Sequence, residues 1–417
     1  MKSINHQEEA VTLHNTTLLT VYHNEVHTAL GEILDYWMHN THDPVHGGFV
    51  GRIDENNVPD ISAPKGAVLN ARILWSFSAA YKKTNKPDHL HLARIAFNYF
   101  VSNFIDKEYG GVYWSLTAQG KPLETKKQIY ALAFAIYGCS AYFEISNNER
   151  AKSVAQDLFR QIETHSFDAA NTGYLEAFTR EWKPLEDQRL SDKDVNAKKT
   201  MNTHLHILEA YTALYRIWPD NKLKTQIKNL LKNFKDHFVD PDTGHLVLFF
   251  DEYWNGKPGI ISYGHDIEAA WLLPEAAEAV NAPSLIIDVN KLSVKLAVAT
   301  KGLDVDGALW YEYDPANQHV VKEKHWWVQA EAMVGFFNHW QLTKDESYLH
   351  RSIESWQFIR EFIQDKTHGE WHWGISGDGT AMKGQDKVGF WKCPYHNTRA
   401  CLEIIKRIET IGNYDSQ

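Results

Sequence analysis

The chain has 417 residues, 43% hydrophobic and 23% charged, values typical of a globular protein with a substantial core. Its formal charge of −10 argues against a nucleic-acid or phosphate-binding surface, so no nucleic-acid partner is expected. The three cysteines form no metal-binding pair and no disulfide framework, the N-terminus lacks a signal-peptide core, and no apolar run approaches the ~20 residues of a membrane span. These features predict a soluble cytoplasmic protein with no membrane partner.

A short pattern recurs along the chain: an acidic residue, a few turn-forming residues, then glycine followed by alternating aromatic and polar residues. Copies occur at Gly47, Gly110, Gly173, Gly244, Gly307 and Gly369, at steps of 63, 63, 71, 63 and 62 residues. A near-constant period of this kind indicates a repeat architecture. The alternation after each glycine predicts short hairpins at one end of the fold.

Between the glycine motifs, apolar residues recur at helical spacing, with about two helices per repeat and about twelve in all. The predicted ranges are, in chain order, 18–38, 67–81, 91–104, 126–143, 150–163, 199–217, 223–238, 265–280, 285–299, 326–340, 347–362 and 388–408. The first and last ranges form the sixth pair. Six helical hairpins that each bury one face close most simply into an inner ring of six helices within an outer ring of six. We therefore predict an all-α (α/α)6 barrel, with residues 1–417 as a single catalytic domain, in preference to an open solenoid with polar capping helices.

The first helix of each pair carries polar or aromatic residues where a core would favour leucine. Arg72 lies among apolar residues of the second predicted helix, and Tyr130 begins an aromatic stripe in the fourth. Farther along, Asn202 and His206 are four residues apart and share one helical face, and Glu209 follows on the same face.

The same pattern continues towards the C-terminus. His265 and Glu268 are three residues apart, and Trp327 and Glu331 are four apart, so each pair shares a helix face. In the last segment Trp391 precedes His396, with a proline between them that marks a helix start. A single histidine or arginine on a helix is usually a core or surface residue. Because several first helices repeat the feature, and buried polar groups are costly unless satisfied, the pattern predicts one convergent polar pocket at the barrel mouth. His204 lies on a different face from His206 and is interpreted as structural.

The residue strings resemble a known family. KGAVLNARILWSFSAAY, MNTHLHILEAY, SYGHDIEAAWLL, WWVQAEA and WKCPYHNTRACLE are similar to the N-acylglucosamine 2-epimerase superfamily, and within it to the cellobiose and mannose 2-epimerases. The resemblance implies an (α/α)6 barrel, reversible inversion at C2 of a reducing sugar, no metal and no redox cofactor. It also implies that the essential histidines are His206, His265 and His396. The residues around the sugar would be Arg72, Asn202, Glu268, Tyr130, Trp327, Trp391 and Glu331, and whether Trp326 or Trp327 faces the pocket stays open.

C2 inversion removes a weakly acidic proton beside a carbonyl and returns a proton to the opposite face through an enediolate. Groups that titrate near neutrality suit this task. His265 and His396, from different repeats, are assigned as the acid/base pair, with Glu268 orienting His265 or binding a hydroxyl. His206 and Arg72 would assist ring opening and hold O1 and O2.

The expected substrate is glucose or mannose, free or at the reducing end of a β-1,4-linked disaccharide such as cellobiose or lactose. A disaccharide enzyme would line a second subsite with the loops around Trp114, Trp182, Trp254, Trp310 and Trp373. The protein is expected to be a monomer or homodimer.

Further activities remain open on the same residues. An aldose–ketose isomerase acting on mannose-type sugars would use a similar site, since the proton would return to C1 instead of C2. A glycoside hydrolase would use Glu268 and Glu331 as paired carboxylates. A metal enzyme would bind its ion through the three histidines, and a non-catalytic protein would bind the sugar without turnover.

Overall fold

The computed structural model describes residues 2–257, 259–300 and 302–414, and the side chains of residues 15–257, 259–300 and 302–412. Within these residues the chain is mostly helical. The α-helices are α1 (Lys2–Asn40), α2 (Ala67–Thr84), α3 (Pro87–Asn103), α4 (Ile129–Ser146), α5 (Glu149–His165), α6 (Met201–Ile217), α7 (Asn221–Asn233), α8 (Tyr263–Ala279), α9 (Pro283–Ala299), α10 (Trp326–Thr343), α11 (Glu346–Phe358) and α12 (Tyr395–Tyr414). The predicted count of about twelve helices is therefore confirmed for the described part of the chain.

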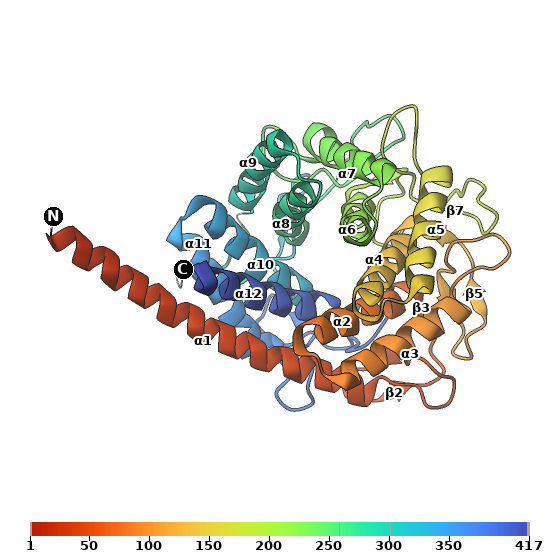
Figure 1. The fold of residues 1–417 in the computed structure, drawn as a ribbon, viewed down its shortest axis with the longest axis horizontal. Coiled ribbons are helices and arrows are strands. Elements are labelled where there is room, and N and C mark those ends of the chain that lie inside the picture. The colour runs from red at the N-terminus through yellow and green to blue at the C-terminus, as the bar shows by residue number, and fades with distance from the viewer. Residues whose placement is uncertain (1, 258, 301, 415–417) are drawn as a thin grey trace.

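Helices α2, α4, α6, α8, α10 and α12 form a closed inner ring, because each contacts the next and α12 contacts α2. The helices α1, α3, α5, α7, α9 and α11 lie outside them (Figure 1). Helix α1 packs on α12, so the two ends of the chain supply the sixth helical pair, as predicted. The protein is an (α/α)6 barrel.

Several helix boundaries differ from the predicted ones. Helix α12 begins at Tyr395, seven residues later than expected, because Pro394 fixes the start of the helix and the residues before it form an isolated bridge at Val388 and then bends. The outer helices α7 and α11 each end in a five-residue π-helical turn, η1 (Phe234–Phe238) and η2 (Ile359–Ile363). Helix α1 is longer than predicted, and its N-terminal part extends beyond the barrel (Figure 1).

The short strands lie in the segments that lead from an outer helix to the next inner helix. They are β1 (Arg52–Ile53), β2 (Pro59–Asp60), β3 (Lys65–Gly66), β4 (Ser115–Leu116), β5 (Pro122–Glu124), β6 (Lys127–Gln128), β7 (Ala177–Phe178), β8 (Lys199–Thr200), β9 (Phe249–Phe250), β10 (Ile261–Ser262), β11 (Glu312–Asp314), β12 (His319–Val321), β13 (Lys324–His325) and β14 (Gly374–Ile375). Local hairpins β1–β2, β4–β5 and β11–β12 agree with the predicted hairpins at one end.

Pairing between repeats was not predicted. The strand before each of α2, α4, α6, α8 and α10 pairs antiparallel with a strand of the following glycine motif. The sixth link is the bridge between Ile53 of the first motif and Val388, shortly before α12, which closes the ring between the two ends of the chain. The links hold the inner helices in a common register.

In five of the six repeats an ion pair joins the acidic residue of the glycine turn to a lysine that precedes an inner helix, and all but the Asp304–Lys324 pair are largely buried. In the first repeat, Lys65 Nζ lies 2.7 Å from Asp43 Oδ2 and 2.7 Å from the carbonyl oxygen of Gly47. The matching pairs are Asp106–Lys127, Asp168–Lys199, Asp304–Lys324 and Asp365–Lys387. The motif glycine in each repeat has a φ between +74° and +82°, a conformation that strongly favours glycine. The turn chemistry therefore repeats with the sequence period.

Helix α4 is the one helix of the described residues that is long and apolar enough, by length and composition, to cross a membrane. No membrane span was predicted for this segment. It contacts both α2 and α6 in the inner ring, and most of it is buried. Its apolar composition is accounted for by this position in the core.

Candidate active site

Five inner helices place a polar or aromatic side chain at the same depth in the barrel. Each of these residues lies five positions after the first residue of its helix: Arg72, Phe134, His206, Glu268 and Glu331. This equivalence follows from the common register that the strand links impose. A layer of functional groups therefore forms near the N-terminal end of the inner ring, where His265 and His396 also lie.

His396 is held by a carboxylate from a different helix. Its Nδ1 lies 2.7 Å from Glu331 Oε1, and both side chains are buried. The same carboxylate accepts hydrogen bonds from Trp271 Nε1 at 3.0 Å and from Arg399 Nη2 at 2.6 Å. Because a carboxylate is an acceptor, this contact favours the neutral tautomer of His396 that has its proton on Nδ1 and an unprotonated Nε2.

His206 has an equivalent partner on its own helix. Its Nδ1 lies 3.0 Å from Glu209 Oε2, and its ring packs 4.7 Å from the ring of Phe134. Glu209 also accepts from the hydroxyl of Tyr395 at 2.6 Å and from Arg399 Nη1. Burial opposes ionisation of Glu209, but Arg399 and His206 outweigh it and hold the pKa of this carboxyl low, at about 2.

His265 has a hydroxyl, not a carboxylate, as its partner. Its Nδ1 lies 2.8 Å from Ser262 Oγ, which precedes α8, so Glu268 is not the group bound to this ring nitrogen. The indole of Trp327 packs 4.9 Å from the ring of His265 and 5.7 Å from that of His396. Trp327 is therefore the tryptophan that faces the site, whereas Trp326 is buried.

Burial lowers the pKa of each of the three site histidines, His206, His265 and His396. The positive charges of Arg72 and Arg399 lower the pKa of His396 further. Each of these shifts favours the neutral form of the ring in the unliganded site. A neutral imidazole is able to accept a proton, which is the state that a general base requires.

Arg72 is a buried cation without a carboxylate partner among the described residues. Its guanidinium donates to the hydroxyl of Tyr130 at 2.8 Å and approaches Cys393 Sγ at 3.8 Å. The guanidinium also lies over the rings of Phe134 and Tyr395, and its Nε has no hydrogen-bond partner among the described residues. A buried charge of this kind is normally paired, so Arg72 is a candidate for binding a negative charge that forms on the ligand.

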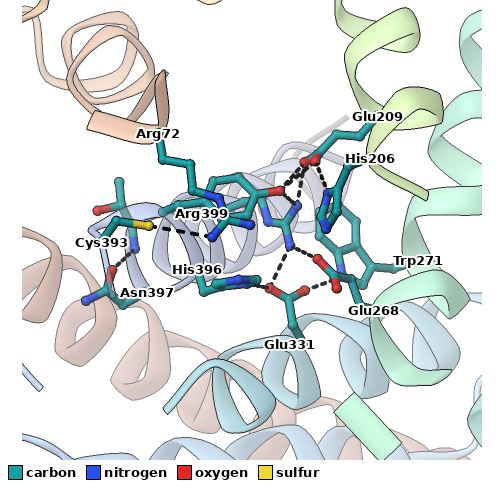
Figure 2. A network of polar contacts seen from close by, with 12 residues as sticks. Arg72, His206, Glu209, Glu268, Trp271, Glu331, Cys393, His396, Asn397 and Arg399 are labelled. Atoms are coloured by element: carbon teal, nitrogen blue, oxygen red, sulfur yellow. Dashed lines mark hydrogen bonds and ion pairs between the residues drawn. The ribbon is translucent and has the colours of Figure 1, made fainter. Parts of the chain in front are cut away.

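Arg399 joins three carboxylates and was not predicted. Its guanidinium donates to Glu209 of α6, Glu268 of α8 and Glu331 of α10, as Figure 2 shows. The sequence signal was an arginine three residues after His396, where the buried face of a helix would place an apolar residue. Glu209 and Trp271 were also left out of the predicted site, although Glu209 shares the helix face of His206.

Other predicted residues lie in different surroundings. Asn202 lies one turn before His206, with its side-chain oxygen buried and without a hydrogen-bond partner among the described residues. The ring of Trp391 lies 6.0 Å from that of Tyr130 and 5.8 Å from that of Trp114, so Trp391 and Tyr130 form one aromatic wall.

The loop tryptophans divide into two kinds. Trp182 and Trp254 stack on histidines of outer helices, His165 and His237, at 4.2 Å in each case. Their indole N–H groups donate to backbone carbonyl oxygens of the preceding glycine motifs, so both side chains stabilise the contact between neighbouring repeats. Trp114 does join the aromatic wall beside Trp391.

His204 is structural, as predicted. Its Nδ1 donates to the carbonyl oxygen of Thr200 at 2.7 Å, and its Nε2 accepts from the backbone N–H of Tyr174 at 2.8 Å. Both ring nitrogens are therefore satisfied, and the side chain is completely buried. His206, two residues along, differs because within the described part of the chain only its Nδ1 is hydrogen-bonded to a protein group.

Among the described residues, one cluster has the spacing of metal ligands, with ligand atoms within 4.8 Å of one another: Glu268, Glu331 and His396. It does not include His206 or His265, so the three histidines do not form the metal site considered from the sequence. Arg399 Nη2 lies 2.5 Å from Glu268 Oε1 and 2.6 Å from Glu331 Oε1. A guanidinium thus already supplies the positive charge between the two carboxylates.

A family model described as N-acylglucosamine 2-epimerase (GlcNAc 2-epimerase) matches residues 47–400. A cellobiose 2-epimerase of Bacteroides fragilis is 48% identical over 374 residues, covering 89% of this chain and 95% of the relative. A D-mannose isomerase of Marinomonas mediterranea is 26% identical over 395 residues, covering 88% of this chain and 92% of the relative. The solved structure of the cellobiose 2-epimerase from Bacillus thermoamylovorans B4167 has a TM-score of 0.89 at 37% identity, covering 93% of this chain and all of that one.

Proposed function

The chain belongs to the N-acylglucosamine 2-epimerase superfamily, on the branch of the cellobiose 2-epimerases, and from this premise we propose that it inverts C2 of a reducing-end aldose by proton transfer between two histidines. It is a carbohydrate epimerase, an enzyme of the isomerase class. The observation that carries the mechanism is that His265 and His396 contact the same indole, that of Trp327, from different helices. Two imidazoles arranged in this way suit access to the two faces of one carbon atom.

The sugar ring opens first, because C2 becomes acidic only beside the free aldehyde. His206 assists this step, and Glu209 at its Nδ1 holds the tautomer whose Nε2 accepts a proton from the O1 hydroxyl. Arg72 lies 5.7 Å or less from the rings of Tyr130, Phe134 and Tyr395 and has no anionic partner among the described residues. It stabilises the negative charge that develops on O1 as the enediolate forms.

The proton transfer then uses the two faces of C2. One imidazole takes the C2 proton. The other takes up a proton from water as negative charge develops on the sugar, and it returns this proton to the opposite face of C2. Burial lowers the pKa of both rings in the free site, and the negative charge of the enediolate raises it again. Glu331 offsets the charge of protonated His396, and exchange with water resets both rings between turnovers.

The proposed substrates are β-1,4-linked disaccharides such as cellobiose and lactose, inverted at the reducing-end glucose. Support comes from the 48% identity to a cellobiose 2-epimerase and from the aromatic wall of Trp391, Tyr130 and Trp114 beside the histidines. Free glucose and mannose are the narrower alternative. Parallel assays on cellobiose, lactose, glucose, mannose and N-acetylglucosamine rank these substrates directly.

The decisive experiment runs the reaction on cellobiose in heavy water. An epimerase places deuterium at C2 of the inverted aldose, whereas an aldose–ketose isomerase yields a ketose labelled at C1. The isomerase is the second candidate, since a D-mannose isomerase is among the relatives. A glycoside hydrolase would release monosaccharide, but Glu268 and Glu331 are bound to one guanidinium, which disfavours their use as an acid–nucleophile pair. Ketose or monosaccharide as the main product would refute the proposal.

A further inference from the structure

The three buried carboxylates of the active site do not receive equal numbers of hydrogen bonds. Glu331 accepts from Trp271, His396 and Arg399, and Glu209 accepts from His206, Tyr395 and Arg399. Among the groups that the structure describes, Glu268 accepts only from Arg399, through Oε1. Its Oε2 is buried and has no partner among the described residues. An ionised carboxylate in such a place would be the least stabilised of the three.

The fixed charges lead to the same residue. Arg72 and Arg399 contribute two positive charges to the site, and the carboxyl groups of Glu209, Glu268 and Glu331 would contribute three negative charges if all were ionised. Glu268 and Glu331 bind the same nitrogen of Arg399, so they lie close enough to repel each other (Figure 2). One proton shared among the carboxylates balances the site. This proton belongs on Glu268, the carboxyl group that accepts the fewest hydrogen bonds.

We infer that Glu268 is a neutral carboxylic acid in the working enzyme and donates a hydrogen bond from Oε2 to a sugar oxygen. The inference rests on the proposed function, since it assigns Glu268 a task in the same reaction. Burial and the charge of Glu331 raise the pKa of Glu268, in agreement with this assignment. Arg399 and Glu209 are the other charged groups that act on it.

A neutral acid suits the chemistry better than a carboxylate at this position. Negative charge develops on the sugar oxygens as the C2 proton leaves, and a nearby carboxylate would oppose it. A donor that keeps its own proton instead stabilises the enediolate. Glu268 therefore acts together with Arg72. With Glu268 neutral, the fixed charges of the site sum to zero before the reaction, so the negative charge of the enediolate is not added to an existing negative charge.

The test compares two isosteric substitutions. Glutamine retains a donor at the position of a carboxylic acid, so Glu268→Gln should lower kcat by no more than about tenfold. Glu268→Met removes the donor and should lower kcat by about 10²–10³-fold, as for loss of one oxyanion donor. Glu331→Gln is the matched control: its amide N–H₂ would face one of three protein donors, so kcat should fall at least as far as in Glu268→Met. If Glu268→Gln loses as much activity as Glu268→Met, the inference is wrong.

Infrared difference spectroscopy gives a readout that does not depend on turnover. Wild-type minus Glu268→Gln should contain a carboxylic-acid C=O band at pH 7, and wild-type minus Glu331→Gln should contain carboxylate bands. The subtraction is needed because burial also raises the pKa of Glu176, to about 8. Absence of the acid band from an enzyme that still places deuterium at C2 refutes the inference alone. Failure of the wild-type enzyme to label C2 refutes the proposed function, whatever the band shows.

Discussion

The Nδ1 atom of His396 lies 2.7 Å from Oε1 of Glu331, across the gap between α12 and α10. Glu331 therefore orients the imidazole and compensates its charge after protonation, as carboxylates do for histidines in many active sites. Among the described residues, the ring of His265, the second imidazole of the proposed pair, has the hydroxyl of Ser262 as its hydrogen-bond partner. The two rings of the proposed pair therefore have unequal partners.

Replacement of either histidine of the pair should stop the exchange at C2. His265→Ala and His396→Ala each remove one of the two proton carriers, so neither direction of epimerisation can be completed. The measurement is deuterium incorporation at C2 of cellobiose, with circular dichroism to confirm folding. His204→Ala is the matched control, because it should reduce stability by leaving the N–H of Tyr174 unpaired but retain C2 labelling. Near-normal labelling by His265→Ala or His396→Ala would contradict the assignment.

A methyl group at Gly264 should disturb the indole between the two histidines. A Cβ at this position would lie 2.5 Å from the ring of Trp327, so the ring must move. We expect Gly264→Ala to lower kcat more than tenfold. Gly31→Ala, on α1, is the control: nothing lies within 4 Å of its Cβ, and alanine favours a helix by about 1 kcal/mol over glycine. Equal activity of the two variants would show that the position of Trp327 does not matter.

The buried ion pairs of the repeats should be important for stability. Lys65→Met leaves Asp43 buried without its partner, and both side chains are at most 1% exposed. We expect a loss of about 3–5 kcal/mol in the free energy of unfolding. Lys83→Met breaks an exposed pair with Glu409 and should change stability by less than about 1 kcal/mol. Denaturant unfolding of the two variants measures the difference, and similar midpoints would contradict it.

Stability should fall on mild acidification because of buried histidines. Burial lowers the pKa of His204 to about 3, whereas an unfolded histidine titrates near 6.5. Above pH 6.5 both states are neutral and stability is constant. As the pH falls from 6.5 towards 3, the unfolded chain binds a proton that the folded protein does not, so the free energy of unfolding decreases.

The apparent melting temperature at pH 7.5 and pH 5 measures this effect. His204→Gln removes one of the buried imidazoles, so its loss of melting temperature between the two values should be smaller than that of the wild type. The comparison uses the difference between the two pH values, since the substitution also lowers stability at pH 7.5. An equal loss in both proteins would mean that His204 does not contribute.

The barrel and the positions of the three histidines followed from the sequence, because both depend on local spacing. The period of the glycine motifs sets the number of helical hairpins, and the segments that contain His206, His265 and His396 were assigned to inner helices, where the structure places them. Helix ends were less certain: Pro394 delays the start of α12, and the π-helical turns extend α7 and α11. The period does not reveal the strand links between neighbouring repeats, because pairing depends on residues some fifty positions apart.

Only the tertiary structure decided how the side chains pair. Arg399 binds Glu209, Glu268 and Glu331, which lie on three other helices, and no spacing within one helix indicates such a contact. The choice between Trp326 and Trp327 also depended on the rotation of α10 about its axis. That rotation is set by packing against α8 and α12 once the ring has closed. The sequence therefore predicts the helices, because their pattern is local. The charge balance of the site depends on side chains from separate helices, so only the tertiary structure shows it.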